Sequence, residues 1–128
     1  MSIGKSIIGA LVIILVLAAC GQKSPEQLFI DQEHDEIMKI HDDVMPRLSD
    51  IHKLRKRLKK DEALKESPLV DVLESADDAM MEWMHAYDKP SPSDPNYEGY
   101  LADQKIKITQ VSKMMLSAIS QAENKLGS

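Results

Sequence analysis

The segment from residue 25 to residue 62 carries apolar residues at a seven-residue spacing. This spacing places the apolar side chains on one face of an α-helix. It predicts one long amphipathic helix over residues 25–62. The heptad positions are Ile30, Ile37, Val44, Ile51 and Leu58.

Single residues indicate where this helix begins and where it is interrupted. Ser24 is a suitable N-cap, Pro25 suits the first helical position, and Gln27 follows three residues after the cap. Pro46 removes one backbone hydrogen bond and presses on the preceding turn. We therefore expect a kink or a break near residues 42–46.

Two further segments also have helical spacing. The apolar stripe after Ser67 predicts a second helix over residues 68–87, and a third is expected over residues 96–126. Three prolines within residues 88–95 exclude a helix from the connection. No alternating segment is long enough to predict a strand. The sequence therefore predicts an all-α fold, an antiparallel three-helix bundle with coiled-coil-like packing and a long first helix kinked near Pro46.

The most apolar segment lies at the N-terminus and has the features of an export signal. Lys5 precedes an uncharged run from Ile7 to Ala19, which is shorter than the roughly 20 residues that span a hydrocarbon core. Residues 17–20, Leu-Ala-Ala-Cys, resemble the lipobox of bacterial lipoproteins. In that family the peptide is cut before the cysteine, which then carries acyl chains such as palmitate.

This resemblance implies a signal peptide over residues 1–19, a lipidated Cys20 with a short tether over residues 20–24, and a helical domain over residues 25–128. Gly21 is not the Asp that retains lipoproteins in the inner membrane of well-studied Gram-negative bacteria. The expected location is therefore the cell envelope, on the periplasmic side of the outer membrane. In a Gram-positive source it would be the outer leaflet of the plasma membrane. An uncleaved signal anchor with an incidental cysteine is the alternative.

Charge and composition narrow the expected function. Without residues 1–19, 15 Lys and Arg stand against 21 Asp and Glu, a net charge of −6. An acidic domain of this kind is not a general nucleic-acid binder. The chain has no Gly-x-Ser-x-Gly motif, no Gly-rich phosphate loop and no cysteine besides Cys20. We therefore expect a protein that is not an enzyme.

The end of the first predicted helix is basic, from Lys53 to Lys60, whereas its beginning is acidic. Both charges complement the helix dipole. A basic run at a helix end is more often a solvated surface than a binding site. If it binds anything, lipid phosphates or an acidic partner are expected.

One constellation of residues is suited to metal chemistry. Residues 34–38 and 41–45 both read His-Asp, an acidic residue, an aliphatic residue and Met, so these histidines and methionines follow one edge of the apolar face. Thioether and imidazole are ligands of Cu(I), and a His and a Met also ligate haem iron in helical bundles. The candidate ligands are His34, Met38, His41, Met45, Met84 and His85.

The same residues also fit ordinary packing. Met fills gaps in cores that are poor in aromatic residues, and this chain has one Trp and one Phe. A heptad also follows from coiled-coil packing alone. We therefore favour packing without a cofactor and keep Cu(I) or haem as the alternative. Trp83, on the apolar stripe of the second helix, is expected in the core.

Three motifs resemble a group of small helical lipoproteins from Bacteroidota. They are H-D-D-V-M-P-R-L at 41–48, I-H-K-L-R-K-R-L at 51–58 and M-M-E-W-M-H-A-Y at 80–87. Some members are named "viral A-type inclusion protein", which reflects coiled-coil character. The resemblance covers roughly residues 1–87 and implies a helical fold and an envelope location, but no activity. It also implies clustering of His41, Met45, Trp83 and Met84.

The sequence thus favours a lipid-anchored, non-enzymatic envelope protein that acts as a helical structural or interaction module. Its expected partners are the membrane, through the lipid, and a second copy or another envelope protein. Dimerisation through the first helix is expected because its two halves exceed what a 20-residue partner can cover. The alternative function is copper or haem handling by the His/Met face of that helix.

Overall fold

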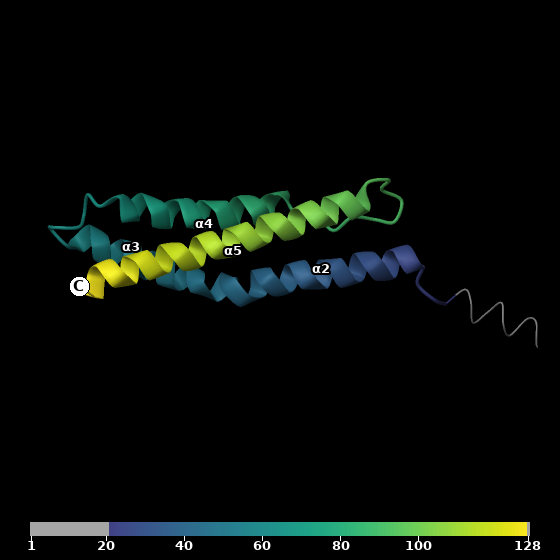
Figure 1. The fold of residues 1–128 in the computed structure, drawn as a ribbon, viewed down its shortest axis with the longest axis horizontal. Coiled ribbons are helices and arrows are strands. Elements are labelled where there is room, and N and C mark those ends of the chain that lie inside the picture. Colours follow the sequence, from purple (N-terminus) through teal and green to yellow (C-terminus); the bar gives the residue numbers. More distant parts are fainter. Residues whose placement is uncertain (1–20, 128) are drawn as a thin grey trace, which may run out of the picture.

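The computed structural model describes residues 21–127, which form a bundle of helices without strands (Figure 1). The first helix of the bundle consists of α2, a 3₁₀ turn η1 and α3. Two further helices, α4 and α5, complete the bundle, so the predicted all-α three-helix fold is confirmed. The elements are α2 (Pro25–Val44), η1 (Met45–Arg47), α3 (Leu48–Lys60), α4 (Pro68–Ala86) and α5 (Tyr97–Gly127).

The predicted signal peptide, residues 1–19, and the predicted lipidation site, Cys20, lie outside the described residues. Within residues 21–127, no helix has both the length and the apolar character needed to cross a membrane.

Serine side chains cap the first and second helices at the residues that the sequence indicates. The Ser24 hydroxyl accepts a hydrogen bond from the Gln27 N–H at 3.1 Å, and the Ser67 hydroxyl accepts one from the Leu69 N–H at 3.3 Å. In each helix a proline follows the cap, where its missing N–H leaves no bond unmade. These local contacts explain why α2 and α4 begin at their predicted residues.

Pro46 changes the form of the first helix without ending it. The turn η1 holds Pro46, and the residues on either side, Val44 and Leu48, keep right-handed helical backbone angles. Proline cannot donate the α-helical hydrogen bond, and one tighter turn accommodates this defect. The expected interruption therefore lies at residues 45–47 and divides the helix into α2 and α3.

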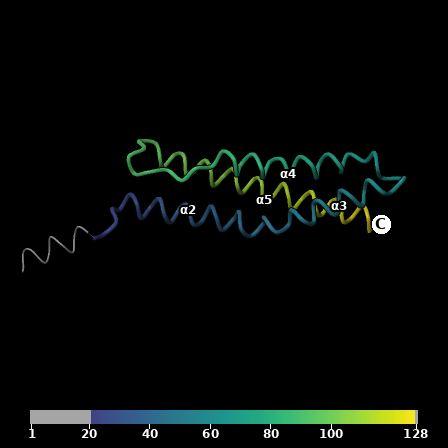
Figure 2. The backbone as a smooth tube through the Cα atoms, turned by 180° about the vertical axis from the view of Figure 1, so that it is seen from behind, coloured from purple at the N-terminus to yellow at the C-terminus, as the bar shows by residue number. Residues whose placement is uncertain are grey.

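The helix α5 is the common neighbour of all the others. It packs against α2, α3 and α4, and α3 also packs against α4 (Figure 1). The 31 residues of α5 therefore cover both halves of the first helix. The start of α2 and the loop between α4 and α5 share one end of the bundle, here called the N-terminal end (Figure 2). The end of α3 and the C-terminus share the opposite end, here called the distal end.

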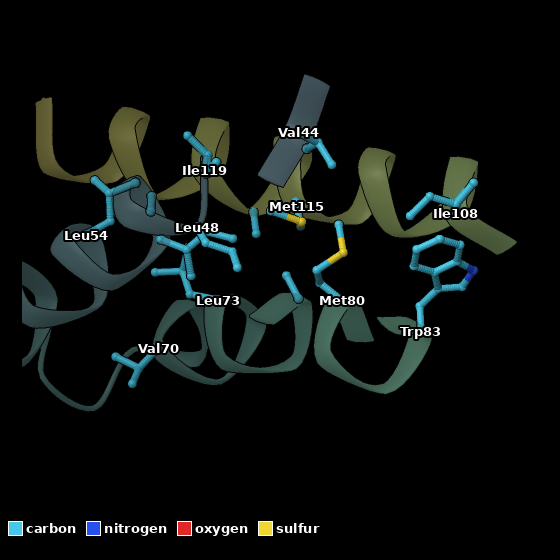
Figure 3. Packing of buried hydrophobic residues seen from close by; sticks show 14 of the residues in the cluster. Val44, Leu48, Leu54, Val70, Leu73, Met80, Trp83, Ile108, Met115 and Ile119 are labelled. Carbon is cyan, nitrogen blue, oxygen red and sulfur yellow. The ribbon is translucent and has the colours of Figure 1, made fainter. Parts of the chain in front are cut away.

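One apolar core runs between the helices (Figure 3). From α4, Leu73, Met80 and Trp83 extend toward α5 and the first helix, with Trp83 beside Ile108. Trp83 is 6% exposed, so it lies in the core where the sequence predicts it. All five heptad positions of the first helix are also buried: Ile30, Ile37, Val44, Ile51 and Leu58.

Candidate functional site

Side-chain rings connect α2 to α4. The Nδ1 atom of His34 lies 2.7 Å from the hydroxyl oxygen of Tyr87, and the two rings are stacked with centroids 5.7 Å apart. One heptad later along α2, the His41 ring lies 5.7 Å from the Trp83 ring. We call this region the ring seam, defined by His34, His41, Trp83, Tyr87 and Tyr100.

The ring seam continues along α4 and onto α5. Trp83 and Tyr87, one helical turn apart, stack with centroids 4.9 Å apart, and Tyr87 in turn stacks on Tyr100 at 6.2 Å. The Tyr100 hydroxyl accepts a hydrogen bond from the Asp88 N–H at 2.9 Å. Burial, reinforced by the nearby Tyr100 and Asp88, raises the pKa of Tyr87 to about 12. Tyr87 is therefore a neutral phenol at physiological pH.

His41 is the most enclosed imidazole of the ring seam, with 9% of its surface exposed. Its Nδ1 atom lies 2.9 Å from Oδ1 of Asp42, whose side chain is exposed. Its other ring nitrogen, Nε2, is buried and has no hydrogen-bond partner, and the same is true of Nε1 of Trp83. Buried polar atoms are nearly always bonded, so these two nitrogens mark an unusual position in the molecule.

The other candidate ligands lie in different surroundings. Met38 of α2 and Met45 of η1 are partly buried and pack against the core, whereas Met84 is 41% exposed and His85 is exposed. His34 is held by Tyr87 and His41 by Asp42 and Trp83, so the two histidines of the repeated heptad have separate partners. Within residues 21–127, no group of three or more His, Cys, Asp and Glu side chains is placed to hold a metal ion.

Ion pairs connect the segment before α2, the α2 helix and the α4–α5 loop at the N-terminal end of the bundle. The Asp31 carboxylate lies 2.7 Å from the ammonium groups of both Lys23 and Lys89. Hydrogen bonds from Lys23, Lys89 and Gln27 hold the pKa of Asp31 well below its usual range. The segment before α2 is thereby tied to the loop between α4 and α5.

A second ionic cluster joins α2 to α5. The Lys105 ammonium contacts the Glu33 carboxylate at 3.2 Å and also the Glu36 carboxylate. Its hydrogen bond to Glu36 is the main cause of a raised pKa at Lys105, and the same bond lowers the pKa of Glu36. Both groups are therefore charged at neutral pH, and they fix the register of α2 against α5.

The distal end carries a basic surface formed by the last turns of α3. His52 and Arg55 share Asp77 of α4, at 2.8 and 3.9 Å, and they line an open hollow of about 240 Å³ with two lysines. The remaining cations of these turns form no ion pair with any residue between 21 and 127, so their charge faces solvent. They are Lys53, Lys56, Arg57, Lys59 and Lys60.

Two other hollows lie along α4 and α5. One, of about 550 Å³, lies at the loop between the helices and is lined by residues that include Lys89, Tyr97 and Tyr100. The other, of about 370 Å³, lies between α4 and α5 beside Trp83 and Met114. Both are open to solvent, and neither contains the unpartnered Nε2 of His41 in its lining.

Sequence reasoning found part of the ring seam. It singled out His34, His41 and Trp83 but not Tyr87, which holds His34 in place, or Tyr100, which stacks on Tyr87. A usable signal was present, because Trp83 and Tyr87 are four residues apart and therefore share a helix face. The sequence of α2 or of α4 alone could not predict that the Trp83 and Tyr87 face of α4 packs against His34 and His41 of α2.

Comparison with known proteins finds no matching family model, no matching curated protein and no matching solved structure.

Proposed function

We propose that this protein is a lipid-anchored, non-enzymatic envelope protein that presents a helical contact surface to a partner. The observation that carries the proposal is the position of the Leu-Ala-Ala-Cys motif, whose Cys20 precedes the first helical residue, Pro25, by five positions. Two or three acyl chains, at about 0.8 kcal/mol per buried CH₂, anchor such a domain stably. The tether then holds the N-terminal end of the bundle at the membrane.

The tether is short, and this orients the molecule. Residues 21–24 span at most about 14 Å when fully extended. The side chains of Leu28 and Phe29, 56% and 42% exposed, lie in the first turn of α2 and suit the apolar side of a membrane interface. The pairing of Asp31 with Lys23 and Lys89 offsets the negative charge nearby. The N-terminal end therefore faces the lipid.

The distal end is the surface that reaches a partner. From Pro25 to Lys60 the first helix rises about 54 Å at 1.5 Å per residue. The basic surface lies at the end of this rise, and most of its cations form no ion pair with any residue between 21 and 127. An acidic envelope protein is the partner that this surface suits, because opposite charges steer association and fix its orientation.

A second copy in the same leaflet suits the basic surface less well. Copies anchored through Cys20 stand in the same direction, so the basic surfaces of two neighbours lie side by side and repel each other. The first helix of one copy is also covered by its own α5. A different, acidic protein is therefore a better partner for the basic surface than a second copy that dimerises through α3.

Metabolic labelling tests the anchor. Cells that express the full chain are given a palmitate analogue, and labelling is compared with that of Cys20→Ser. We expect label on the full chain, none on Cys20→Ser, and accumulation of the precursor with globomycin. Equal labelling of both chains, or processing that globomycin does not affect, would contradict the anchor.

Crosslinking in intact membranes tests the contact surface. The double substitution Lys56→Glu and Lys59→Glu reverses two charges in the basic surface, and Lys107→Glu with Lys113→Glu is the matched control on the exposed face of α5. We expect one discrete adduct with an acidic envelope protein, lost in the first variant and retained in the second. An adduct between two copies of this chain would contradict the acidic partner and indicate a homodimer. The absence of any reproducible adduct would refute the proposed contact surface.

A further inference from the structure

The imidazole of His41 has a buried nitrogen that nothing in the bundle uses. Nε2 has neither solvent contact nor a hydrogen-bond partner. Leaving such a group unsatisfied destabilises a folded protein, because the buried nitrogen has lost its hydrogen bonds to water. An apolar residue at position 41 would avoid this cost, because the neighbouring positions of the same stripe, Ile37 and Val44, are apolar and buried. A ligand bound to Nε2 would account for an imidazole at this position.

Asp42 determines what Nε2 can bind. Its carboxylate lies 2.9 Å from His41 Nδ1, so that nitrogen carries the proton and donates it to Oδ1. In a neutral imidazole with Nδ1 protonated, Nε2 presents a lone pair and acts as an acceptor or a metal ligand. When one ring nitrogen of a histidine binds a metal, the other commonly donates its N–H to a carboxylate, as Nδ1 of His41 does to Asp42.

Two methionines lie one helical turn from His41 on the first helix. Met38 precedes His41 by three residues and Met45 follows it by four, and both spacings place residues next to each other on a helix surface, with Cβ atoms about 5–6 Å apart. Both methionines are partly buried and pack against the core. Met38, His41 and Met45 thus form a row that runs along α2 into the first residue of η1.

A third methionine, Met84, lies on α4 beside Trp83 in the sequence. Met84 follows Trp83, the ring that lies 5.7 Å from His41, and is one turn after the fully buried Met80 on α4. It is 41% exposed. Solvent therefore reaches the side chain of Met84.

The other three histidines are less suited to this role. His34 uses Nδ1 in its contact with Tyr87, and His52 uses Nε2 in its contact with Asp77. His85 is exposed. The methionines within one turn of it are Met81, which is partly buried, and Met84, which is exposed. Only His41 combines burial, a carboxylate on one nitrogen and a free lone pair on the other.

We propose that Nε2 of His41, together with the thioethers of Met38 and Met45, binds a single Cu(I) ion, with Asp42 as a positioning residue. Thioether sulfur is a soft ligand that selects Cu(I), and imidazole also ligates copper. The Trp83 ring, which stacks on Tyr87, lies 5.7 Å from the His41 ring, so a haem bound on this side of His41 would have to displace Trp83. This site is independent of the proposed anchor and of the distal contact surface.

Titration of the full chain in detergent tests the site directly. All variants carry Cys20→Ser, so that a free thiol cannot bind the metal. Cu(I) is supplied without oxygen as its complex with a chromophoric chelator, and Ag(I) serves as a redox-inert probe. Trp83 is the only tryptophan and adjoins His41, so its fluorescence reports occupancy. We expect one equivalent to bind with submicromolar affinity, quench Trp83 and bind at least about 100-fold more tightly than Zn(II).

Matched substitutions locate the ligands. His41→Gln should abolish submicromolar binding, and Met38→Leu with Met45→Leu should weaken it at least about tenfold while preserving core volume. Met114→Leu, on the exposed side of α5, is the control and should have no effect. Circular dichroism of each variant verifies that the helices are intact, and the double Leu variant keeps the test decisive if His41→Gln does not fold.

Asp42 provides the sharpest test of the arrangement. Asp42→Asn should weaken Cu(I) binding about 10–100-fold, as expected for the partner of a metal-bound histidine. Asp43→Asn removes the same charge from the next residue, which pairs with Lys39 instead, and should leave binding unchanged. Equal affinity in His41→Gln, or no competition with the chelator, would overturn the proposal and leave a buried water as the partner of Nε2.

Discussion

The N-terminal and distal halves of the bundle are built differently, although both lie along the same helix α5. In the distal half, α3 packs directly on α4 through aliphatic side chains. In the N-terminal half, α2 and α4 are joined by rings that carry polar atoms, two of which have no partner. The 3₁₀ turn at Pro46 separates the two halves.

The difference shows where the bundle is specialised. A core of Leu and Ile needs only shape and volume, and the distal half meets that requirement with Leu54, Leu58 and Leu73. Rings are larger, and their nitrogens and hydroxyls must be satisfied when they are buried. The ring seam meets this requirement at His34 but not at Nε2 of His41. The distal half of the core is therefore held together by aliphatic packing, whereas the ring seam contains buried polar atoms without a hydrogen-bond partner in residues 21–127.

The largest effect is expected from removing the central ring of the seam. Trp83→Ala deletes the ring that stacks on Tyr87 and contacts His41, and a buried Trp replaced by Ala typically costs about 3–5 kcal/mol. Urea denaturation, followed by circular dichroism, measures the loss in the free energy of unfolding. Little loss with cooperative unfolding intact would place Trp83 outside the stabilising core.

A comparable but somewhat smaller loss is expected in the distal half. Leu73→Ala truncates a fully buried residue of α4, with an expected cost of about 2–5 kcal/mol. This variant should leave Cu(I) binding unchanged once conditions are chosen in which it is folded, because Leu73 lies in the aliphatic half. A selective loss of binding in Leu73→Ala would show that the halves are coupled.

The contact between His34 and Tyr87 should contribute less. Tyr87→Phe keeps the stack with Trp83 and removes the hydroxyl that lies 2.7 Å from Nδ1 of His34. We expect a loss of about 0.5–1.5 kcal/mol, the usual net value of one hydrogen bond. His34→Ala in the Tyr87→Phe background completes a double-mutant cycle, and a coupling energy near zero would contradict the contribution of this contact.

His41→Leu should have little effect on stability or increase it slightly. Leucine removes a buried nitrogen that has no partner, and replacing such a group with an apolar one is close to neutral. The free energy of unfolding is measured without metal, where a change within about 1 kcal/mol is expected. A loss as large as that of Leu73→Ala would mean that the imidazole itself is essential to packing.

Acid should weaken the ion pairs of the N-terminal half. The pKa values of Asp31 and Glu36 are lowered in the folded protein by lysines, whereas unfolded carboxyls titrate near pH 4. Their contribution is therefore fully present above that pH and is lost as the pH falls below it. The stability difference between the unmodified chain and Asp31→Asn should shrink between pH 7 and pH 2 in urea denaturation. A constant difference across this range would contradict the role of the carboxylate charge.

The helices could be predicted closely because their signals are local. The predicted ranges 25–62 and 96–126 differ by one or two residues from the observed ends at Lys60 and Gly127. The form of the interruption at Pro46 could not be predicted, because a kink, a break and a 3₁₀ turn all accommodate a missing N–H. The candidate site was only partly predicted, since the sequence grouped six His and Met residues without indicating that His41 alone has an unused buried nitrogen.

By itself the sequence determined the number, length and apolar face of the helices, because spacing and caps act within a few residues along the chain. It also set the charge difference between the two ends of the first helix. Only the tertiary structure decided which polar atoms of that helix find partners. Whether Nε2 of His41 is buried depends on Trp83, some forty residues away, and a contact of that kind exists only after the helices have packed.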